Sequence, residues 1–251
     1  TVNRLCGSSL DALGIAANAI KAGSCDLMIA GGVESMSRAP FVMAKADAAF
    51  SRSTAIEDTT LGWRFVNPAM KALYGVDSMP ETAENVAQQF NISRADQDRF
   101  ALNSQLRVAQ AQQQGWFDDE LIAVTIAQRK DGPTVVRVDE HPRATTTLAS
   151  LANLKGVVRP DGSVTAGNAS GINDGACALL LASGQGAVQH GLTPRARIVA
   201  VAAAGVAPRI MGFGPAPAIR KVLAKANLTL EQMDVIELNE AFAAQALAVL
   251  R

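Results

Sequence analysis

The sequence has few of the residues that build disulfide frameworks or metal sites. Its three cysteines, Cys6, Cys25 and Cys177, lie far apart without a CxxC pair, and it has only two histidines. This pattern argues against a disulfide-stapled protein and against a zinc site, and it suits a reducing compartment. We therefore expect a cytoplasmic protein with no bound metal.

The chain also lacks an excess of charge of one sign and a long apolar run. Lysine plus arginine number 23 and aspartate plus glutamate number 23, so no global positive field attracts nucleic acid or an anionic membrane. No apolar stretch approaches the roughly 20 residues of a membrane span. A P-loop, a GxGxxG motif and an HExxH motif are all missing from the sequence. An anionic ligand would therefore be held by local basic residues.

Each end of the chain resembles the interior of a secondary-structure element. Thr1 is not an initiator methionine, and the first residues, TVNRLCGSS, resemble the end of a buried strand. The last residues, AFAAQALAVLR, stop inside a helical pattern with no terminating glycine or proline. We expect truncation at both ends.

The periodicity of apolar residues predicts an α/β protein. Residues 8–21 have helical spacing and residues 26–32 form a short apolar run, which together predict a helix followed by a strand. The stretch 42–171 differs in composition: it holds both tryptophans, the only tyrosine and a glutamine-rich helix expected to begin after Ser93. We interpret this stretch as an inserted domain.

Further elements are expected along the second half of the chain. A hairpin is predicted from strands near 121–128 and 134–138, joined by a turn at Asp131-Gly132. Apolar runs at 176–183, 195–206 and 233–238 predict strands, and a helix is predicted to begin at Asn239 or just before it.

Cys6 is the first candidate for chemistry. It precedes the helix expected at 8–21, where free backbone N–H groups and the helix dipole favour a thiolate. Gly7 would let a substrate carbonyl approach these donors. The alternative is that Cys6 is a small buried apolar residue, as we expect for Cys25 and Cys177.

Two polar segments are candidates for ligand binding. Residues 164–176, VTAGNASGINDGA, combine glycines with Asn168, Ser170, Asn173 and Asp174. The alternative is a connecting loop without a ligand, which could have the same composition. In NEAFA, residues 239–243, an asparagine amide and a carboxylate could hold a water or a substrate oxygen. The alternative there is a helix cap formed by Asn239.

The two histidines are interpreted as structural or solvated. His190 is expected at an exposed helix end, and His141 is expected in a loop ahead of Arg143.

Taken together, six segments resemble the successive signatures of the thiolase family, in the order in which that family carries them. They are NRLCGSSLDAL, IAGGVESMS, SMPETAENVA, SRADQD, VTAGNASGINDGA and ELNEAFA. The resemblance covers essentially the whole chain. The segment RFVNPAMKALYGVDSMPETAEN further resembles the 3-oxoadipyl-CoA thiolases.

The resemblance implies a layered αβαβα fold with two similar halves and an inserted loop domain. It implies an incomplete N-terminal half at 1–41 and 172–193, a CoA-binding loop domain at 42–171, and an incomplete C-terminal half at 194–251. Members of the family are dimers or tetramers.

The resemblance also implies roles for individual residues. Cys6 matches the nucleophile that takes the acyl group as a thioester. Asn239 matches an asparagine that holds a water in one oxyanion hole, and the backbone N–H of Cys6 would serve in the other. Residues matching CoA contacts are Met79, Arg143, Ala166 and Ser170. CoA is thus expected as a co-substrate, with no bound cofactor.

The implied reaction is cleavage of a 3-ketoacyl-CoA, expected to be 3-oxoadipyl-CoA, with CoA to acetyl-CoA and a shortened acyl-CoA. Thiolases take their acid and base from a downstream histidine and a second cysteine, and this chain ends before either, so the 251 residues alone are expected to be inactive. The alternatives are a non-catalytic CoA-binding thiolase-fold protein, a biosynthetic acetoacetyl-CoA thiolase, and a related decarboxylating condensing enzyme.

Overall fold

The structure is a computed structural model that describes residues 1–128 and 132–251. The chain divides into two compact units. Unit 1 contains Thr1–Val76, Ile172–Gly205 and Pro215–Ile236, and unit 2 contains Asp77–Gly171, Val206–Gly214 and Glu237–Arg251. These limits differ from the halves and loop domain expected from the sequence, and that division stays a prediction.

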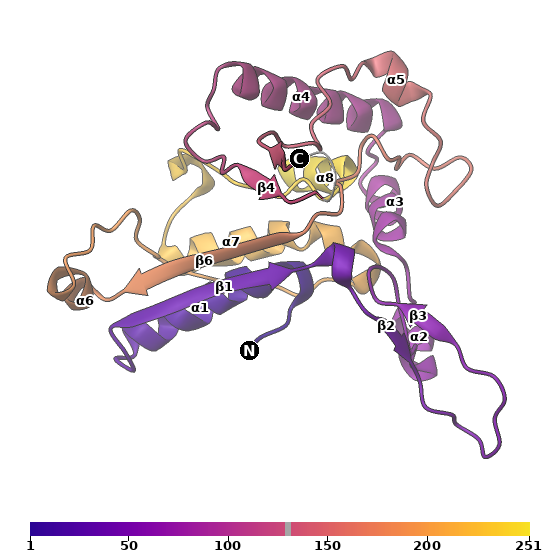
Figure 1. Ribbon diagram of the computed structural model, residues 1–251, viewed down its shortest axis with the longest axis horizontal. Coiled ribbons are helices and arrows are strands. Elements are labelled where there is room, and N and C mark those ends of the chain that lie inside the picture. Colours follow the sequence, from indigo (N-terminus) through magenta and orange to yellow (C-terminus); the bar gives the residue numbers. More distant parts are fainter. Residues whose placement is uncertain (129–131) are drawn as a thin grey trace. The chain divides into compact units, whose positions relative to one another are not determined.

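Unit 1 is built around one helix and two strands. Strand β1 (Leu27–Glu34) pairs antiparallel with β6 (Gly175–Ala182), and helix α1 (Ser8–Lys21) packs against both (Figure 1). The buried contact between helix and strands consists of three alanines, Ala16, Ala17 and Ala30, together with Leu181. Small side chains let the helix lie close to the strands.

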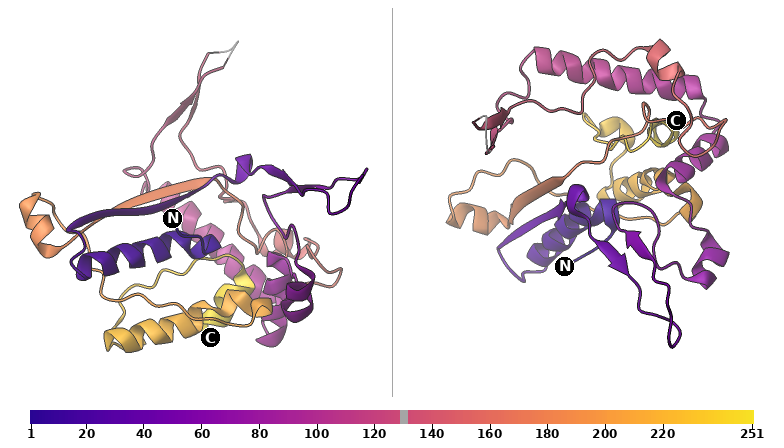
Figure 2. Two further views of the ribbon diagram at one scale, coloured as in Figure 1. Left: turned by 90° about the horizontal axis from the view of Figure 1, so that it is seen from below. Right: turned by 45° about the vertical axis from the view of Figure 1, so that its right-hand side comes forward.

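The remaining elements of unit 1 are short. After the turn η2 (Met36–Arg38), β2 (Phe41–Met43) pairs with β3 (Ile56–Asp58), and the segment between them extends away from β1 and β6 (Figures 1 and 2). The other helical elements are α2 (Pro68–Tyr74), α6 (Gly184–Gln189), α7 (Pro215–Ala226) and η4 (Leu230–Gln232).

Unit 2 is mainly helical. Helix α3 (Met79–Gln89) packs against α8 (Ala243–Leu250) and the turn η3 (Pro208–Phe213), and α4 (Arg94–Gln113) packs against α8 and α5 (Leu148–Ala152). A cluster of buried apolar residues joins α3, the turn after it and α8: Val86, Ala87, Ile92, Ala244 and Ala248. The rings of Phe90 and Phe213 stack beside it with centroids 4.3 Å apart.

Most of the expected elements are confirmed. The helix at 8–21, the strands near 26–32 and 176–183, and the helix after Ser93 all form. The hairpin forms between β4 (Val124–Ile126) and β5 (Thr134–Val136). Asp131 of its expected turn lies outside the described residues.

Three expected strands are wrong. The first four residues, 195–206 and 233–238 belong to no hydrogen-bonded strand in the described part of the chain. An apolar, β-branched run predicts a buried extended segment, but a strand also needs a neighbouring backbone with which to pair. Among residues 1–128 and 132–251, no helix is both long and apolar enough to cross a membrane.

The first prediction concerns the close approach of β1 and β6. A Cβ atom at Gly31 would lie 2.2 Å from the Cys177 carbonyl oxygen, and backbone cannot move aside as a flexible side chain can. We expect Gly31→Ala to lower the free energy of unfolding by about 2 kcal/mol or more, measured by urea denaturation. The control is Gly184→Ala, since a Cβ there meets nothing within 4 Å. Equal stability of the two variants would contradict this packing.

The second prediction concerns Asp174 at the start of β6. Its carboxylate accepts hydrogen bonds from the Ser37 hydroxyl and from the Ser37 backbone N–H, the latter at 2.8 Å. The bond from the hydroxyl and then the bond from the backbone hold the pKa of Asp174 below its ordinary value. A lowered pKa stabilises the fold above the unfolded-state pKa, and the gain is lost as the pH falls through the folded-state value.

We therefore expect Asp174→Asn to be less stable than the parent near neutral pH, and the difference to shrink at acid pH. Denaturation midpoints measured from about pH 7 to about pH 3 test this expectation, with the exposed Asp161→Asn as the control. A difference between parent and Asp174→Asn that is constant with pH would show that the Ser37 contact does not govern the titration.

Candidate functional site

Cys6 lies in unit 1, on a strained turn just before α1. The turn η1 (Leu5–Gly7) is 3-10 helical, and α1 begins at Ser8. Leu5 has φ of 51°, a left-handed conformation that is uncommon for a residue other than glycine and that clusters at functional sites. The Ser8 hydroxyl donates to the Leu5 carbonyl (2.6 Å) and accepts from the Arg4 N–H (2.9 Å). Cys6 is exposed, so the alternative of a buried apolar cysteine is wrong.

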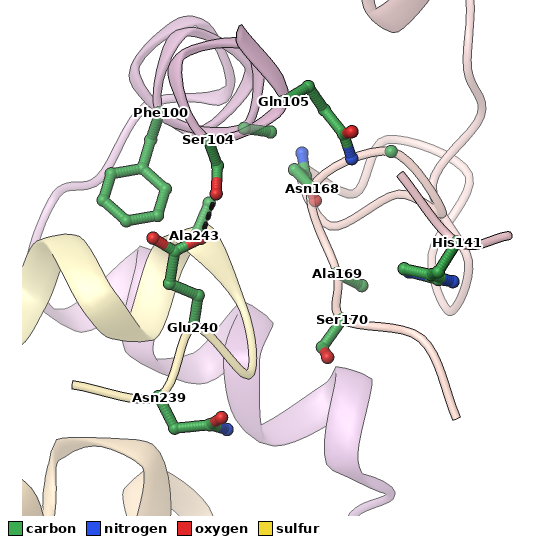
Figure 3. Close-up of a pocket in the computed structure, with 12 residues that line it drawn as sticks. Phe100, Ser104, Gln105, His141, Asn168, Ala169, Ser170, Asn239, Glu240 and Ala243 are labelled. Atoms are coloured by element: carbon green, nitrogen blue, oxygen red, sulfur yellow. Dashed lines mark hydrogen bonds between the residues drawn. The ribbon is translucent and has the colours of Figure 1, made fainter. Parts of the chain in front are cut away.

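Unit 2 contains a pocket of about 210 Å³. Three parts of the chain supply most of its wall: α4, the segment 167–170 and the segment 239–243. In Figure 3, α4 with Ser104 and Gln105 lies above the pocket, and Ser170 and Asn239 lie below them on the two segments. The polar side chains in this wall are Ser104, Gln105, His141, Asn168, Ser170, Asn239 and Glu240.

Two backbone hydrogen bonds join the two segments. The Ser170 N–H donates to the Ala241 carbonyl, and the Ala243 N–H donates to the Asn168 carbonyl, both at 2.9 Å. Ala169 and Phe242 thereby form an antiparallel bridge. The segment that carries Ser170 and the segment that carries Asn239 are therefore one hydrogen-bonded unit.

Buried side chains fix residues 163–168 from two helices. The Glu84 carboxylate of α3 accepts from the Val164 N–H (2.7 Å) and the Ser163 hydroxyl (2.9 Å). The Asp98 carboxylate of α4 accepts from the Asn168 side-chain amide (3.0 Å). Glu84, Asp98 and Asn168 are all buried. Buried polar groups that are hydrogen-bonded hold a loop in one conformation, because breaking them leaves unpaired groups away from water.

The pocket brings together only part of the set expected from the sequence. Ser170 and Asn239 line it, whereas Met79, Arg143 and Ala166 lie elsewhere in unit 2. Met79 is the first residue of α3, and Ala166 is exposed in the segment that leads to Ser170. The Arg143 N–H donates to the Gln105 side-chain oxygen at 2.7 Å.

The two histidines differ from each other in their surroundings. His190 caps the C-terminus of α6 and is exposed, as expected. His141 lines the pocket, and its ring packs on Gly171, where a Cβ atom would lie 2.1 Å from the ring. The sequence near His141 did not predict a contact for its ring, because Gly171 is distant along the chain.

Two further expectations are wrong. Asn239 is not a helix cap, and no helix begins there: α8 begins at Ala243 after the extended residue Phe242 (φ −146°, ψ 142°). Residues 241–243 use their backbone groups in the bridge to 168–170, which prevents them from forming the first helical turn. Cys177 is exposed and Cys25 is half-buried, so neither is a core residue.

Sequence reasoning missed the contribution of α4 to the pocket. Phe100, Ala101, Ser104 and Gln105 line it, and their spacing is that of one face of a helix. That spacing is visible in the sequence, but it does not show which other segment the face meets. In the described part of the chain, no cluster of three or more histidine, cysteine or carboxylate side chains could hold a metal ion.

Comparison with known proteins identifies the family. The family model described as "Thiolase, N-terminal domain" matches residues 1–185, and the one described as "Thiolase, C-terminal domain" matches residues 192–251. A beta-ketoadipyl-CoA thiolase of Acinetobacter baylyi is 67% identical over all 251 residues. A 3-oxoadipyl-CoA/3-oxo-5,6-dehydrosuberyl-CoA thiolase of Escherichia coli is 63% identical over the same length. The chain spans 63% of the length of each of these relatives.

Solved structures agree with these matches. Human mitochondrial 3-ketoacyl-CoA thiolase in complex with CoA superposes with a TM-score of 0.86 at 40% identity, over 99% of this chain and 61% of that one. The α/β, thiolase-like fold expected from the sequence is thus confirmed. Since both thiolase domain models match and the full 251 residues align with known thiolases, the chain belongs to the thiolase family.

Proposed function

We propose that the full-length protein cleaves 3-oxoadipyl-CoA with CoA, through an acyl-enzyme on Cys6. The observation that carries this proposal is the 67% identity, over every residue of the chain, to a beta-ketoadipyl-CoA thiolase. The exposed position of Cys6 on a strained turn before α1 supports its role as the nucleophile.

The chemistry proceeds in two half-reactions. The Cys6 thiolate attacks the 3-keto carbon, the C2–C3 bond breaks, and the electron pair stays with the acetyl-CoA part, which must then take a proton. The remaining four-carbon dicarboxylic acyl group is left on Cys6 as a thioester. A second CoA thiol attacks this thioester and releases the shortened acyl-CoA. The resemblance implies that a histidine and a second cysteine move the protons.

The resemblance assigns one oxyanion hole to the backbone N–H of Cys6, and Asn239 is proposed to hold a water in the other. Its side chain lines the pocket and is not used as a helix cap. An amide fixed in advance at the position where charge develops stabilises the transition state more than the ground state.

Met79, Arg143, Ala166 and Ser170 are proposed as contacts of CoA. Ser170 lies in the same pocket wall as Asn239, and Arg143 is exposed, as a residue that meets phosphate must be. The balanced total charge is compatible with this arrangement, since one local cation can hold a phosphate without a global positive field. The proposal extends to a cytoplasmic homodimer or homotetramer without a resident cofactor.

The third prediction tests the nucleophile. Brief incubation of the full-length protein with acetyl-CoA is expected to add one acetyl group to Cys6, detected by intact mass and peptide mapping. Cys6→Ala should abolish the adduct, whereas Cys25→Ala and Cys177→Ala should retain it. CoA binding without any adduct on Cys6 would instead favour the non-catalytic, CoA-binding alternative.

The fourth prediction separates the two pocket residues by kinetics. Asn239→Ala is expected to lower kcat by about 100-fold or more with little change in KM, because it removes a donor that acts mainly in the transition state. Ser170→Ala is expected to raise the KM for CoA by several-fold, with kcat nearly unchanged. The matched control is Asn153→Ala, an exposed asparagine at the end of α5. If Asn239→Ala changed only KM, the oxyanion role would be excluded.

A further inference from the structure

A buried chain of polar contacts leads from α4 to the candidate site. The Arg94 guanidinium donates to the Asp98 carboxylate at 2.8 Å, and the other oxygen of Asp98 accepts from the Asn168 amide at 3.0 Å. Asp98 is 5% exposed and Asn168 is 4% exposed. A buried carboxylate requires such partners, since an unpaired one would be strongly destabilising.

Asn168 uses every polar group of its side chain. Its Oδ1 accepts from the Thr165 N–H (2.8 Å), and its Nδ2 donates to both Asp98 and the Ser163 carbonyl (3.0 Å each). The main-chain carbonyl of the same residue accepts from the Ala243 N–H. One residue therefore connects α4, the segment before Ser170 and the segment after Asn239.

A second contact ties the other segment to the same helix. The Ser104 hydroxyl of α4 donates to the Glu240 carboxylate at 2.5 Å, and Glu240 is the neighbour of Asn239 in the chain (Figure 3). Asp98 and Ser104 lie six positions apart on one helix, which is a rigid spacing of about 9 Å. Helix α4 thus holds both segments, and the bridge between Ala169 and Phe242 joins them.

We propose that Asp98 and Asn168 are positioning residues that fix the Asn239 amide and the Ser170 hydroxyl relative to each other. The group that serves one oxyanion hole and the group that contacts CoA are then held as one body. This inference rests on the proposed function, in which Asn239 and Ser170 have these two roles.

Removing a functional side chain and loosening its position change the kinetic constants in different ways. Removal of Asn239 or Ser170 alone changes mainly kcat or mainly KM, but loosening the pair changes both together. A merely structural defect reduces the fraction of folded enzyme, which lowers the apparent kcat and leaves KM unchanged. A joint change in kcat and KM therefore reports positioning.

The test uses Asn168→Asp in the full-length protein. This change keeps the shape of the side chain but places a carboxylate at residue 168 against the carboxylate of Asp98. The other charged groups nearby are Arg94 of α4 and Glu84 of α3. At about pH 8 we expect kcat to fall about tenfold and the KM for CoA to rise about tenfold. As the pH is lowered to about pH 6, the facing carboxylates share a proton and the contact re-forms, so kcat/KM relative to the parent should rise.

Two further variants make the result decisive. In Asp98→Asn combined with Asn168→Asp, an amide again faces a carboxylate, and we expect part of both kcat and KM to be restored. Val86→Ala is the control, because the Val86 side chain is fully buried in the apolar cluster with α8 and makes none of these polar contacts. It should change the folded fraction and leave KM unchanged. If Asn168→Asp does not fold, Ser104→Ala replaces it, because this exposed contact can be lost without unfolding. In Ser104→Ala we expect kcat to fall and the KM for CoA to rise, each several-fold.

Three outcomes overturn the inference. In the first, Asn168→Asp behaves like Val86→Ala, with KM unchanged and no recovery at low pH. In the second, Asn168→Asp is unfolded and Ser104→Ala has the KM for CoA of the parent. In the third, the parent enzyme itself forms no acyl group on Cys6, which removes the proposed function and this inference with it. If the parent enzyme is active and the variants behave like the control, only the positioning roles of Asp98 and Asn168 are excluded.

Discussion

Two backbone hydrogen bonds between residues 168–170 and 241–243 determine the geometry of the candidate site. They keep Phe242 extended, delay the start of α8 to Ala243, and leave the side chain of Asn239 directed to a pocket instead of a helix end. The same bonds give Ser170 and Asn239 a common support. A small backbone bridge, stabilised by buried carboxylates on α3 and α4, therefore converts two separate sequence motifs into one wall of a site.

The position of Cys6 depends on a different set of contacts. Its turn combines the left-handed Leu5 with a serine that bonds on both sides, and a helix of 14 residues follows directly. Strain of this kind persists only when the surrounding contacts compensate for it. Helix α1 supplies them by packing small residues closely onto β1 and β6.

The sequence predicted the family, the fold class and those elements whose signals are local. Helix α1, helix α4 with its Ser93 cap, and strand β6 follow from periodicity and capping. The failures share one cause, which is that the deciding contact is distant in the chain. Residues 195–206 read as a strand but have no backbone partner among the described residues, and the helix expected at Asn239 begins four residues later because of the bridge to residue 168. The face of α4 in the pocket was visible as a spacing, but only the fold shows that it meets the segment around Ser170.

The most direct test of a two-step mechanism is a single-turnover experiment on the full-length protein with 3-oxoadipyl-CoA and no free CoA. An acyl-enzyme mechanism predicts release of one acetyl-CoA per active site, with the four-carbon acyl group retained on Cys6 until CoA is added. Release of acetyl-CoA only after CoA is supplied, or release of both products without a protein-bound acyl group, would contradict a Cys6 thioester.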